Sequence, residues 1–490
     1  MDKTVKEIWS RYSSGLDFKN SIGLFDTVKE NENFFIGRQW EGVEAGGLPT
    51  PVFNFLKRVI LFLVASITTD EIKVQAAPMG LASRSSAEKQ FAADVVNTAL
   101  DTIFERNALP NLLREYIRAS AVDGDGCLYT RFDPDFETGE KLRGEIRTEL
   151  VPNTRVFFGN PNSRDVQSQP WIIISSRRFC SELSALAGQT VRPDEADGCA
   201  PVSEPDDKAT LLLHMRKDER GHVIACETTR EALIREEWDT GLTLYPVTWL
   251  PWDAVPDCCH GMAAVTGLIP NQIFVNKLFA MAMLSLMTTA YPKVVYDRTR
   301  IPKWDNRVGA AIGVLGDVSG AAQIIDPAAV SPQISQFIGL AVEYTQNFLG
   351  ATDTAMGNVR PDNTSAIIAV QRASNIPLEM VKQELFRSVE ELARIYIDNM
   401  RAYYGLRAAE DAEGRVIEFD FAGLALAPMS LKIDVGPGSY WSEIAAVQTL
   451  DNLLAGGRIS LEDYLTRLPE GFISHRAELI ERTRAREAER

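Results

Sequence analysis

Hydrophobic and polar positions follow two different periods in the first half of the chain. Apolar residues at helical spacing predict helices over residues 16–40, 51–67, 83–107, 110–122 and 178–189. Short runs of alternating apolar and polar residues predict antiparallel strands at residues 127–132, 143–151, 156–158, 171–175, 210–215, 223–228 and 245–250. Together the two patterns predict an α+β fold.

The pattern changes after Trp252, where a long apolar segment begins. Residues 267–290 are apolar on nearly every side and carry one charge, at Lys277, so a helix here must be buried on all sides. Strand-like pieces at 293–296 and 323–325 follow, and a second long helix is predicted over residues 332–356. Two long helices therefore bracket a compact insert.

The last part of the chain mixes long helices with short strands. A polar stretch, residues 358–375, precedes a helix predicted over residues 378–404 that has one apolar and one ionic face. Two strands and then helical pieces are predicted at 416–421, 430–435, 441–454, 460–466 and 473–490. The sequence contains no internal repeat, so a repeat architecture is excluded.

The composition is that of an ordinary globular protein, which excludes a disordered or collagen-like chain. The 490 residues are 45% hydrophobic and 24% charged. The net charge is −16, whereas proteins that wrap DNA by neutralising its phosphates are usually basic. A general DNA-binding protein is therefore excluded, although an acidic chain can surround DNA without gripping it.

Cysteine usage and hydropathy bear on the compartment. The six cysteines are sparse and irregularly spaced, which predicts a reducing compartment and no disulfide framework. The start of the sequence shows no secretory signal. The apolar run at 59–67 is too short to span a bilayer, and the stretch at 255–291 is interrupted by Pro270 and several polar residues. We expect a soluble protein with no membrane segment.

No sequence pattern specifies catalysis. The phosphate-binding G-x-x-x-x-G-K-[ST] loop is absent, and residues 133–140 do not fit a calcium-binding loop, which leaves a hairpin turn there. Cys258, Cys259 and His260 form a dense metal-like cluster, but adjacent cysteines do not easily both bind a tetrahedral zinc ion. We expect small buried residues at a helix entrance there, and no catalytic residue, metal or cofactor.

The order of these elements, and several stretches of sequence within it, resemble the portal proteins of tailed bacteriophages. The resembling stretches are NFFIGRQWEGVEAGGLPTPVFNFLKRVILFLVASITTDEIKV (33–74), DGDGCLYTRFDPD (123–135), GLIPNQIFVNKLFA (267–280), GATDTAMGNVRPDNTSAIIAVQ (350–371) and WSEIAAVQTLDNLLAGGRISLEDYLTRLPEG (441–471). Together they cover most of the chain in the family's order.

The resemblance implies a portal-like, mainly α fold. Its parts would be a wing with antiparallel strands (1–255 and 405–440), two stem helices (256–290 and 331–357), a small α/β clip (291–330), a tunnel loop with a long helix (358–404) and a helical crown (441–490). Portals are dodecameric rings at one capsid vertex, assembled in the cytoplasm of the bacterial host.

The resemblance also implies a role and partners. Double-stranded DNA would pass through the ring when the terminase motor packages the genome and again when it is ejected. The implied partners are the terminase large subunit, the head–tail adaptor, and the major capsid and scaffolding proteins, with no membrane. The portal itself is not an enzyme and needs no cofactor, in keeping with the absent phosphate-binding loop.

Two groups of residues follow as candidate sites. The clip is locally basic, and its candidates for contact with terminase and adaptor are Lys293, Arg298, Arg300, Lys303 and Arg307. The tunnel-loop candidates for transient contact with DNA are Arg360, Asn363, Thr364, Ser365, Gln371 and Arg372. The alternatives are an ordinary solvated face for the first group and a helix-capping loop for the second.

Two other classes of protein remain open at this point. One is another oligomeric virion component, a head–tail adaptor or a minor capsid protein, which would lack the two helices and the insert between them. The other is a metal-dependent nuclease that uses clustered carboxylates, and the missing metal-ligand spacing argues against it.

Overall fold

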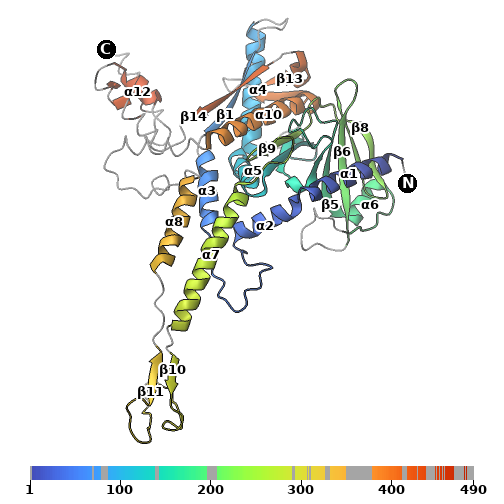
Figure 1. The fold of residues 1–490 in the computed structure, drawn as a ribbon. Coiled ribbons are helices and arrows are strands. Elements are labelled where there is room, and N and C mark those ends of the chain that lie inside the picture. The colour runs from blue at the N-terminus through green and yellow to red at the C-terminus, as the bar shows by residue number, and fades with distance from the viewer. Residues whose placement is uncertain are drawn as a thin grey trace.

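The chain folds into a mixed α+β body from which a narrow arm projects (Figure 1). The computed structural model describes residues 3–68, 71–78, 86–137, 143–195, 207–289, 293–305, 307, 311–325, 332–348, 378–410, 416–426, 429–436, 458–467 and scattered positions between 447 and 482. We call α7 (Ala264–Thr289), residues 293–325 and α8 (Pro332–Phe348) the arm. The α+β class is as predicted.

Two helices, and not one, form the N-terminal part of the body. Helix α1 spans Lys3–Ser21 and α2 spans Leu24–Ile36, whereas the sequence predicted one helix over 16–40. Gly23 separates them with a φ of 65°, a left-handed conformation that glycine adopts at little cost. Because of this break α1 can pack on the five-stranded sheet described below, where Ile8 and Tyr12 join the buried cluster around Phe157.

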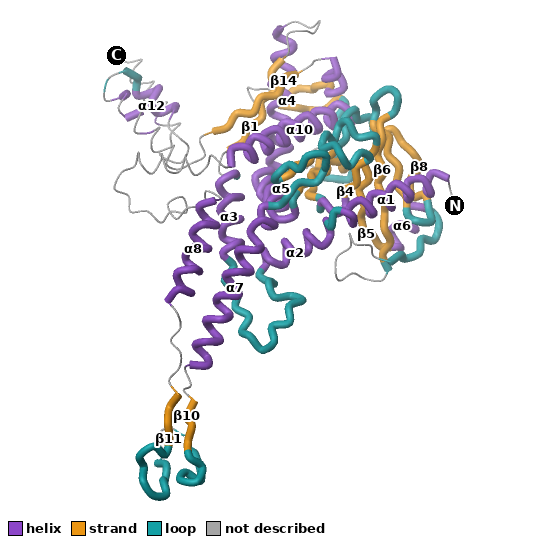
Figure 2. The backbone as a smooth tube through the Cα atoms, viewed as in Figure 1, coloured by secondary structure: helices purple, strands orange, loops and turns teal. Residues whose placement is uncertain are grey.

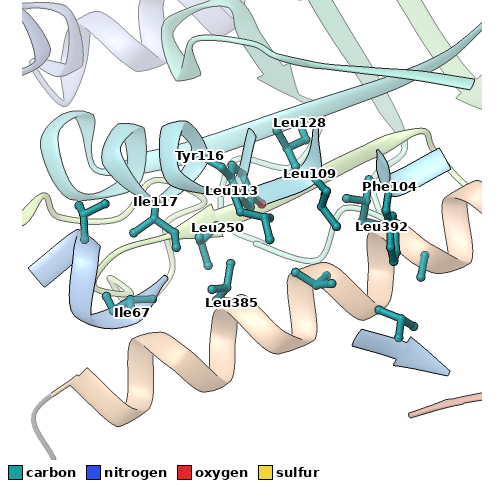
Figure 3. Packing of buried hydrophobic residues seen from close by; sticks show 14 of the residues in the cluster. Ile67, Phe104, Leu109, Leu113, Tyr116, Ile117, Leu128, Leu250, Leu385 and Leu392 are labelled. Carbon is teal, nitrogen blue, oxygen red and sulfur yellow. The ribbon is translucent and has the colours of Figure 1, made fainter. Parts of the chain in front are cut away.

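Helices α3 (Phe55–Ile67), α4 (Ser86–Arg106), α5 (Leu109–Asp123) and α10 (Glu379–Tyr403) enclose the main core. Helix α3 starts four residues later than predicted because the Asn54 side chain accepts a hydrogen bond from the Lys57 amide and so caps it. The predicted apolar face of α10 is confirmed: Leu385 and Leu392 are buried against α5 and β9 (Figure 3).

Two antiparallel sheets complete the centre of the body. The smaller has the order β3-β2-β9 and consists of β2 (Asp125–Asp133), β3 (Glu145–Leu150) and β9 (Val247–Pro251). The larger has the order β4-β5-β6-β7-β8 and consists of β4 (Val156–Phe158), β5 (Trp171–Phe179), β6 (Lys208–Lys217), β7 (Val223–Thr228) and β8 (Leu233–Asp239). The short helices η1 (Asn153–Arg155) and α6 (Cys180–Ala187) connect these strands.

Most of these strands were predicted. Strands β2 and β3 pair antiparallel, as the hairpin expected around residues 133–140 requires, while residues 138–142 lie outside the described residues. Strand β8 was missed. It lies at the sheet edge and its sequence, LIREEWD, is largely charged and exposed, so it lacks the alternation that marks a half-buried strand.

Two small sheets lie at the top of the body. Strand β1 (Glu71–Pro78) pairs with β14 (Met429–Gly436), and β12 (Leu406–Glu410) pairs with β13 (Val416–Asp420), which η3 (Phe421–Leu426) follows. The sequence predicted β13 and β14 but neither β1 nor β12. Helix α12 (Leu461–Arg467) agrees with the helix predicted at 460–466, whereas the piece at 473–490 and most of that at 441–454 lie outside the described residues.

The helices that the structure describes include none long and apolar enough to cross a membrane.

Candidate functional site

The arm consists of two antiparallel helices with a small sheet at its tip (Figures 1 and 2). The Asn271 amide of α7 donates a hydrogen bond to Thr345 Oγ1 of α8 at 3.0 Å. Thr345 is buried between the helices and donates in turn to the Ala341 carbonyl at 2.7 Å. This contact joins the two helices near the body.

Apolar side chains are exposed along both arm helices. On α7, Phe274 is 47% exposed and Met281 49%, and on α8 Tyr344 is 58% exposed. Met283, Leu284, Leu286, Met287, Phe337 and Leu340 are exposed as well. The sequence predicted that residues 267–290 must be buried on all sides, but among the described residues only α8 accompanies the outer part of α7. An exposed apolar surface of this extent marks an interaction site.

A buried chain of amide side chains fixes the root of the arm. Gln272 is fully buried and donates to the Phe53 carbonyl at 2.9 Å and to Asn276 Oδ1 at 3.0 Å. The Asn276 amide donates to Gln39 Oε1 at 2.6 Å. Because an unpaired buried amide is costly, this network ties α7 firmly to the segment around Gln39 and Phe53. Sequence reasoning counted Gln272 and Asn276 only as breaks in an apolar stretch.

The segment between α2 and α3 is held by two further side chains. The Asn54 amide donates to the carbonyls of Phe34 and Phe35 at 3.2 and 3.0 Å, and Trp40 Nε1 donates to the Pro51 carbonyl at 2.9 Å. Phe53 then stacks on Phe279 of α7, with ring centroids 4.0 Å apart. Two of the stretches that carry the portal resemblance, 33–74 and 267–280, therefore meet at the root of the arm.

The turn that leads into α7 is anchored on a buried carboxylate. Asp125 Oδ2 is 2.7 Å from His260 Nδ1, and Asp125 Oδ1 accepts the Gly261 amide at 2.7 Å. Helix α7 therefore begins at Ala264 rather than at 256, since residues 256–263 are held against the body. Cys259 and His260 are buried as predicted, while Cys258 is partly exposed. Burial raises the pKa of the Cys259 thiol to about 12.

Asp123, the last residue of α5, supports a prediction about pH. Its Oδ1 is buried and has no hydrogen-bond partner among the described residues, and burial raises its pKa to about 7. The carboxylates of Glu32 and Asp125 also raise this pKa, and Arg118 lowers it. Because the folded state binds the proton more tightly than the unfolded state, stability is lost as pH rises from about 4 to about 7.

We expect Asp123→Asn to raise the free energy of unfolding by about 1–3 kcal/mol at pH 8, because the neutral amide avoids this cost. At pH 4.5 the variant and the wild type should differ little. Urea unfolding at both pH values measures the difference. A gain of the same size at both would show that the charge of Asp123 is not the cause.

A compact set of turns forms the tip of the arm. The two strands predicted here, β10 (Lys293–Tyr296) and β11 (Ala322–Ile325), are present and pair antiparallel, and Tyr296 stacks on Trp304 with centroids 5.1 Å apart. Within residues 293–305, 307 and 311–325 the structure describes strands and turns but no helix, whereas the resemblance implied an α/β clip.

Acidic neighbours neutralise part of the basic cluster at the tip. Arg300 lies 3.5 Å from Asp297, and Arg307 lies 2.6 Å from Asp305. Arg298 and Lys303 are exposed, and Lys293 begins β10. The cluster therefore presents less net positive charge than its sequence indicates. The six tunnel-loop candidates lie outside the described residues: Arg360, Asn363, Thr364, Ser365, Gln371 and Arg372.

A pocket in the body bears on the nuclease alternative. It has a volume of 580 Å³ and lies between the loops around Asp165 and Asp257 and helix α10, whose Glu384 and Glu391 line it together with Arg387. Burial raises the pKa of Glu391. Over the ranges that the structure describes, no three His, Cys, Asp or Glu side chains are grouped so that they could hold a metal ion.

Comparison with known proteins bears on the resemblance to portal proteins. Residues 197–407 match the family model of the phage P22-like portal protein. The matched range starts before β6 and includes the whole arm and α10. No curated protein matches the chain. The match confirms the resemblance to the portal proteins of tailed phages that was found in the sequence.

Proposed function

We propose that this portal protein forms a ring at one capsid vertex, through whose axial channel double-stranded DNA is packaged and later ejected. The exposed apolar surface of the arm carries this proposal. Copies of the chain would bury that surface, and one contact repeated between different faces of each copy closes into a ring. The subunit number that the family suggests is twelve.

The parts of the chain then take portal roles. The body supplies the wing (1–255 and 405–440), and α7 and α8 supply the stem within residues 256–290 and 331–357. The tip of the arm corresponds to the clip (291–330), residues 358–404 to the tunnel loop and long helix, and 441–490 to the crown. The projection of the arm away from the body supports this assignment (Figure 1). A head–tail adaptor or minor capsid protein would have no such arm.

The clip is the proposed contact for the terminase large subunit and the head–tail adaptor. Arg298 and Lys303 offer exposed positive charge there, and Leu315 and Val318 are exposed apolar side chains in another turn of the tip. Mixed apolar and basic surface is typical of protein–protein interfaces. The major capsid and scaffolding proteins would contact the outside of the ring in the host cytoplasm, before the portal becomes part of the virion.

DNA would pass through the ring without being gripped or cleaved. The net charge of −16 leaves few phosphates neutralised, so attraction to DNA is weak. We assign transient phosphate contacts to the tunnel-loop residues, among them Arg360 and Arg372. We propose no catalytic role, because the sequence lacks the phosphate-binding loop that a packaging motor requires.

Electron microscopy and native mass spectrometry of the purified chain test this function. We expect closed rings with an axial hole, wide at the body and narrow at the clip, with the mass of about twelve subunits. Rings without a narrow end would favour the adaptor alternative. A monomer or dimer at every salt concentration would overturn the proposal, and metal-dependent DNA cleavage by that species would favour the nuclease.

A further inference from the structure

The two arm helices carry opposite single charges. Lys277 is the one charged residue of α7, and Glu343 is the one charged residue of α8. Both side chains are exposed, and neither makes an ion pair with any residue that the structure describes. An isolated charge on an otherwise apolar helix needs either solvent or a partner of opposite sign.

Lys277 lies at the rim of a pocket at the root of the arm. The pocket has a volume of 480 Å³ and lies between α2, residues 38–43 and α7. Phe34, Trp40 and Ile273 line it with apolar surface. Charged residues of both signs complete the lining: Asp26, Lys29, Glu30, Arg38, Glu41 and Lys277. Its walls are fixed, because Trp40 is bound to the Pro51 carbonyl and Asn276 to Gln39. The pocket is large enough to hold an aromatic side chain.

This pocket faces away from α8. Successive residues of an α-helix are about 100° apart around its axis. Ile273 and Lys277 are two and six residues beyond Asn271, which contacts Thr345 of α8. They therefore lie about 200° and 240° around from the α8 contact. In Figure 1 the loop between α2 and α3 and helix α8 accordingly lie on opposite sides of α7.

Helix α8 exposes a complementary ridge. Phe337, Leu340 and Tyr344 follow the three- and four-residue spacing of one helix face and are all exposed. Glu343 stands next to Tyr344 in this exposed stretch. At 1.5 Å per residue, Tyr344 is within about 2 Å of the level of Ile273 along the arm, counted from the Asn271–Thr345 contact. The levels of Glu343 and Lys277 along the arm differ by about 6 Å, a distance that a lysine side chain can span.

We propose that in the ring Tyr344 of each subunit enters the pocket of the next subunit, where Glu343 pairs with Lys277 of that neighbour. A head-to-tail contact closes around an axis when two different faces of each copy meet at the same height along the arm. The ridge on α8 and the pocket beside α7 meet this requirement. The charges of Lys277 and Glu343 are opposite in sign, and both halves of the contact belong to the same chain, which favours a second copy over another protein. This inference rests on the proposed function.

Charge exchange tests the contact in the full-length protein. We expect Lys277→Glu and Glu343→Lys each to raise the subunit concentration at which half the rings form by about tenfold, because like charges then meet at every interface. The double variant Lys277→Glu with Glu343→Lys should return it to within about threefold of wild type. Lys6→Glu, an exposed reversal on α1, is the matched control and should leave assembly unchanged.

Cross-linking makes the outcome specific. Cysteines placed at 277 in one batch of chains and at 343 in another should link when the batches are mixed, and neither batch should link alone, with the wild type as control for native cysteines. If rings form normally in both single reversals, or if cross-links form within one batch, the proposed contact is overturned while the proposed ring still stands. Absence of rings in the wild type would instead overturn the proposed function.

Discussion

Replacing Phe274 and Met281 together by aspartate is expected to convert rings into monomers without unfolding the chain. Both side chains are about half exposed on the same face of α7, so the fold of the single subunit gains little from them. In a ring they would be buried at every subunit contact, and an unpaired carboxylate buried in an apolar interface costs several kcal/mol. Repeated around the ring, that cost should abolish assembly at micromolar concentration.

Sedimentation velocity and electron microscopy measure the loss of rings, and thermal unfolding followed by circular dichroism checks the fold. Leu186→Asp is a suitable control, because Leu186 is an exposed leucine on α6, away from the arm. We expect this control to assemble like wild type. Rings in the double variant would show that the apolar face of α7 is not the subunit interface, and a fallen melting temperature would show that Phe274 and Met281 support the fold instead.

The helices of the body could be predicted from sequence because their signals are local. The apolar face of α10, which contains Leu385, Val389 and Leu392, repeats at three and four residues and is buried as predicted. Strand β1 could not be predicted in the same way. Strand β1 finds its partner β14 near the other end of the chain, and a pairing between such distant segments leaves no pattern within either one.

The root of the arm shows a second limit. Polar residues inside an apolar helix signal a special environment, and Gln272 and Asn276, four residues apart, lie on one helix face. The sequence alone does not show that Gln39 is the partner, because that contact depends on the path of the segment between α2 and α3. The net charge at the tip of the arm could not be predicted from a count of basic residues either, since nearby aspartates pair with Arg300 and Arg307.

The buried carboxylate of Asp125 is a polar group whose loss should strongly destabilise the body. Sequence reasoning placed this residue in the D-G-D-G step after α5 and gave it no partner. In the structure it is almost fully buried on β2 and accepts hydrogen bonds from the His260 ring and the Gly261 amide, and Asn153 Nδ2 lies 3.4 Å from it. Gly124 beside it has a φ of 97°, and a Cβ there would meet the Gly261 oxygen at 2.7 Å. The residues that follow α5 therefore pack closely against the turn that precedes α7.

We expect Asp125→Ala to lower the free energy of unfolding by about 3–5 kcal/mol, because His260 and the Gly261 amide stay buried without their acceptor. Asp125→Asn should cost about 1–2 kcal/mol, since its carbonyl can still accept the Gly261 amide. Asp135→Ala, an exposed aspartate in the turn after β2, is the matched control and should change stability by less than about 0.5 kcal/mol. Urea unfolding of the three variants measures these differences.

Hydrogen exchange tests where the effect of Asp125→Ala is localised. Because Asp125 holds the turn of residues 256–263, amide protection should fall first there and at the start of α7, before the large sheet is affected. A loosened root would let the arm change direction relative to the body, so rings of this variant should have a less defined narrow end. Uniform loss of protection over the whole body would show instead that Asp125 stabilises the core as a unit and does not specifically position the arm.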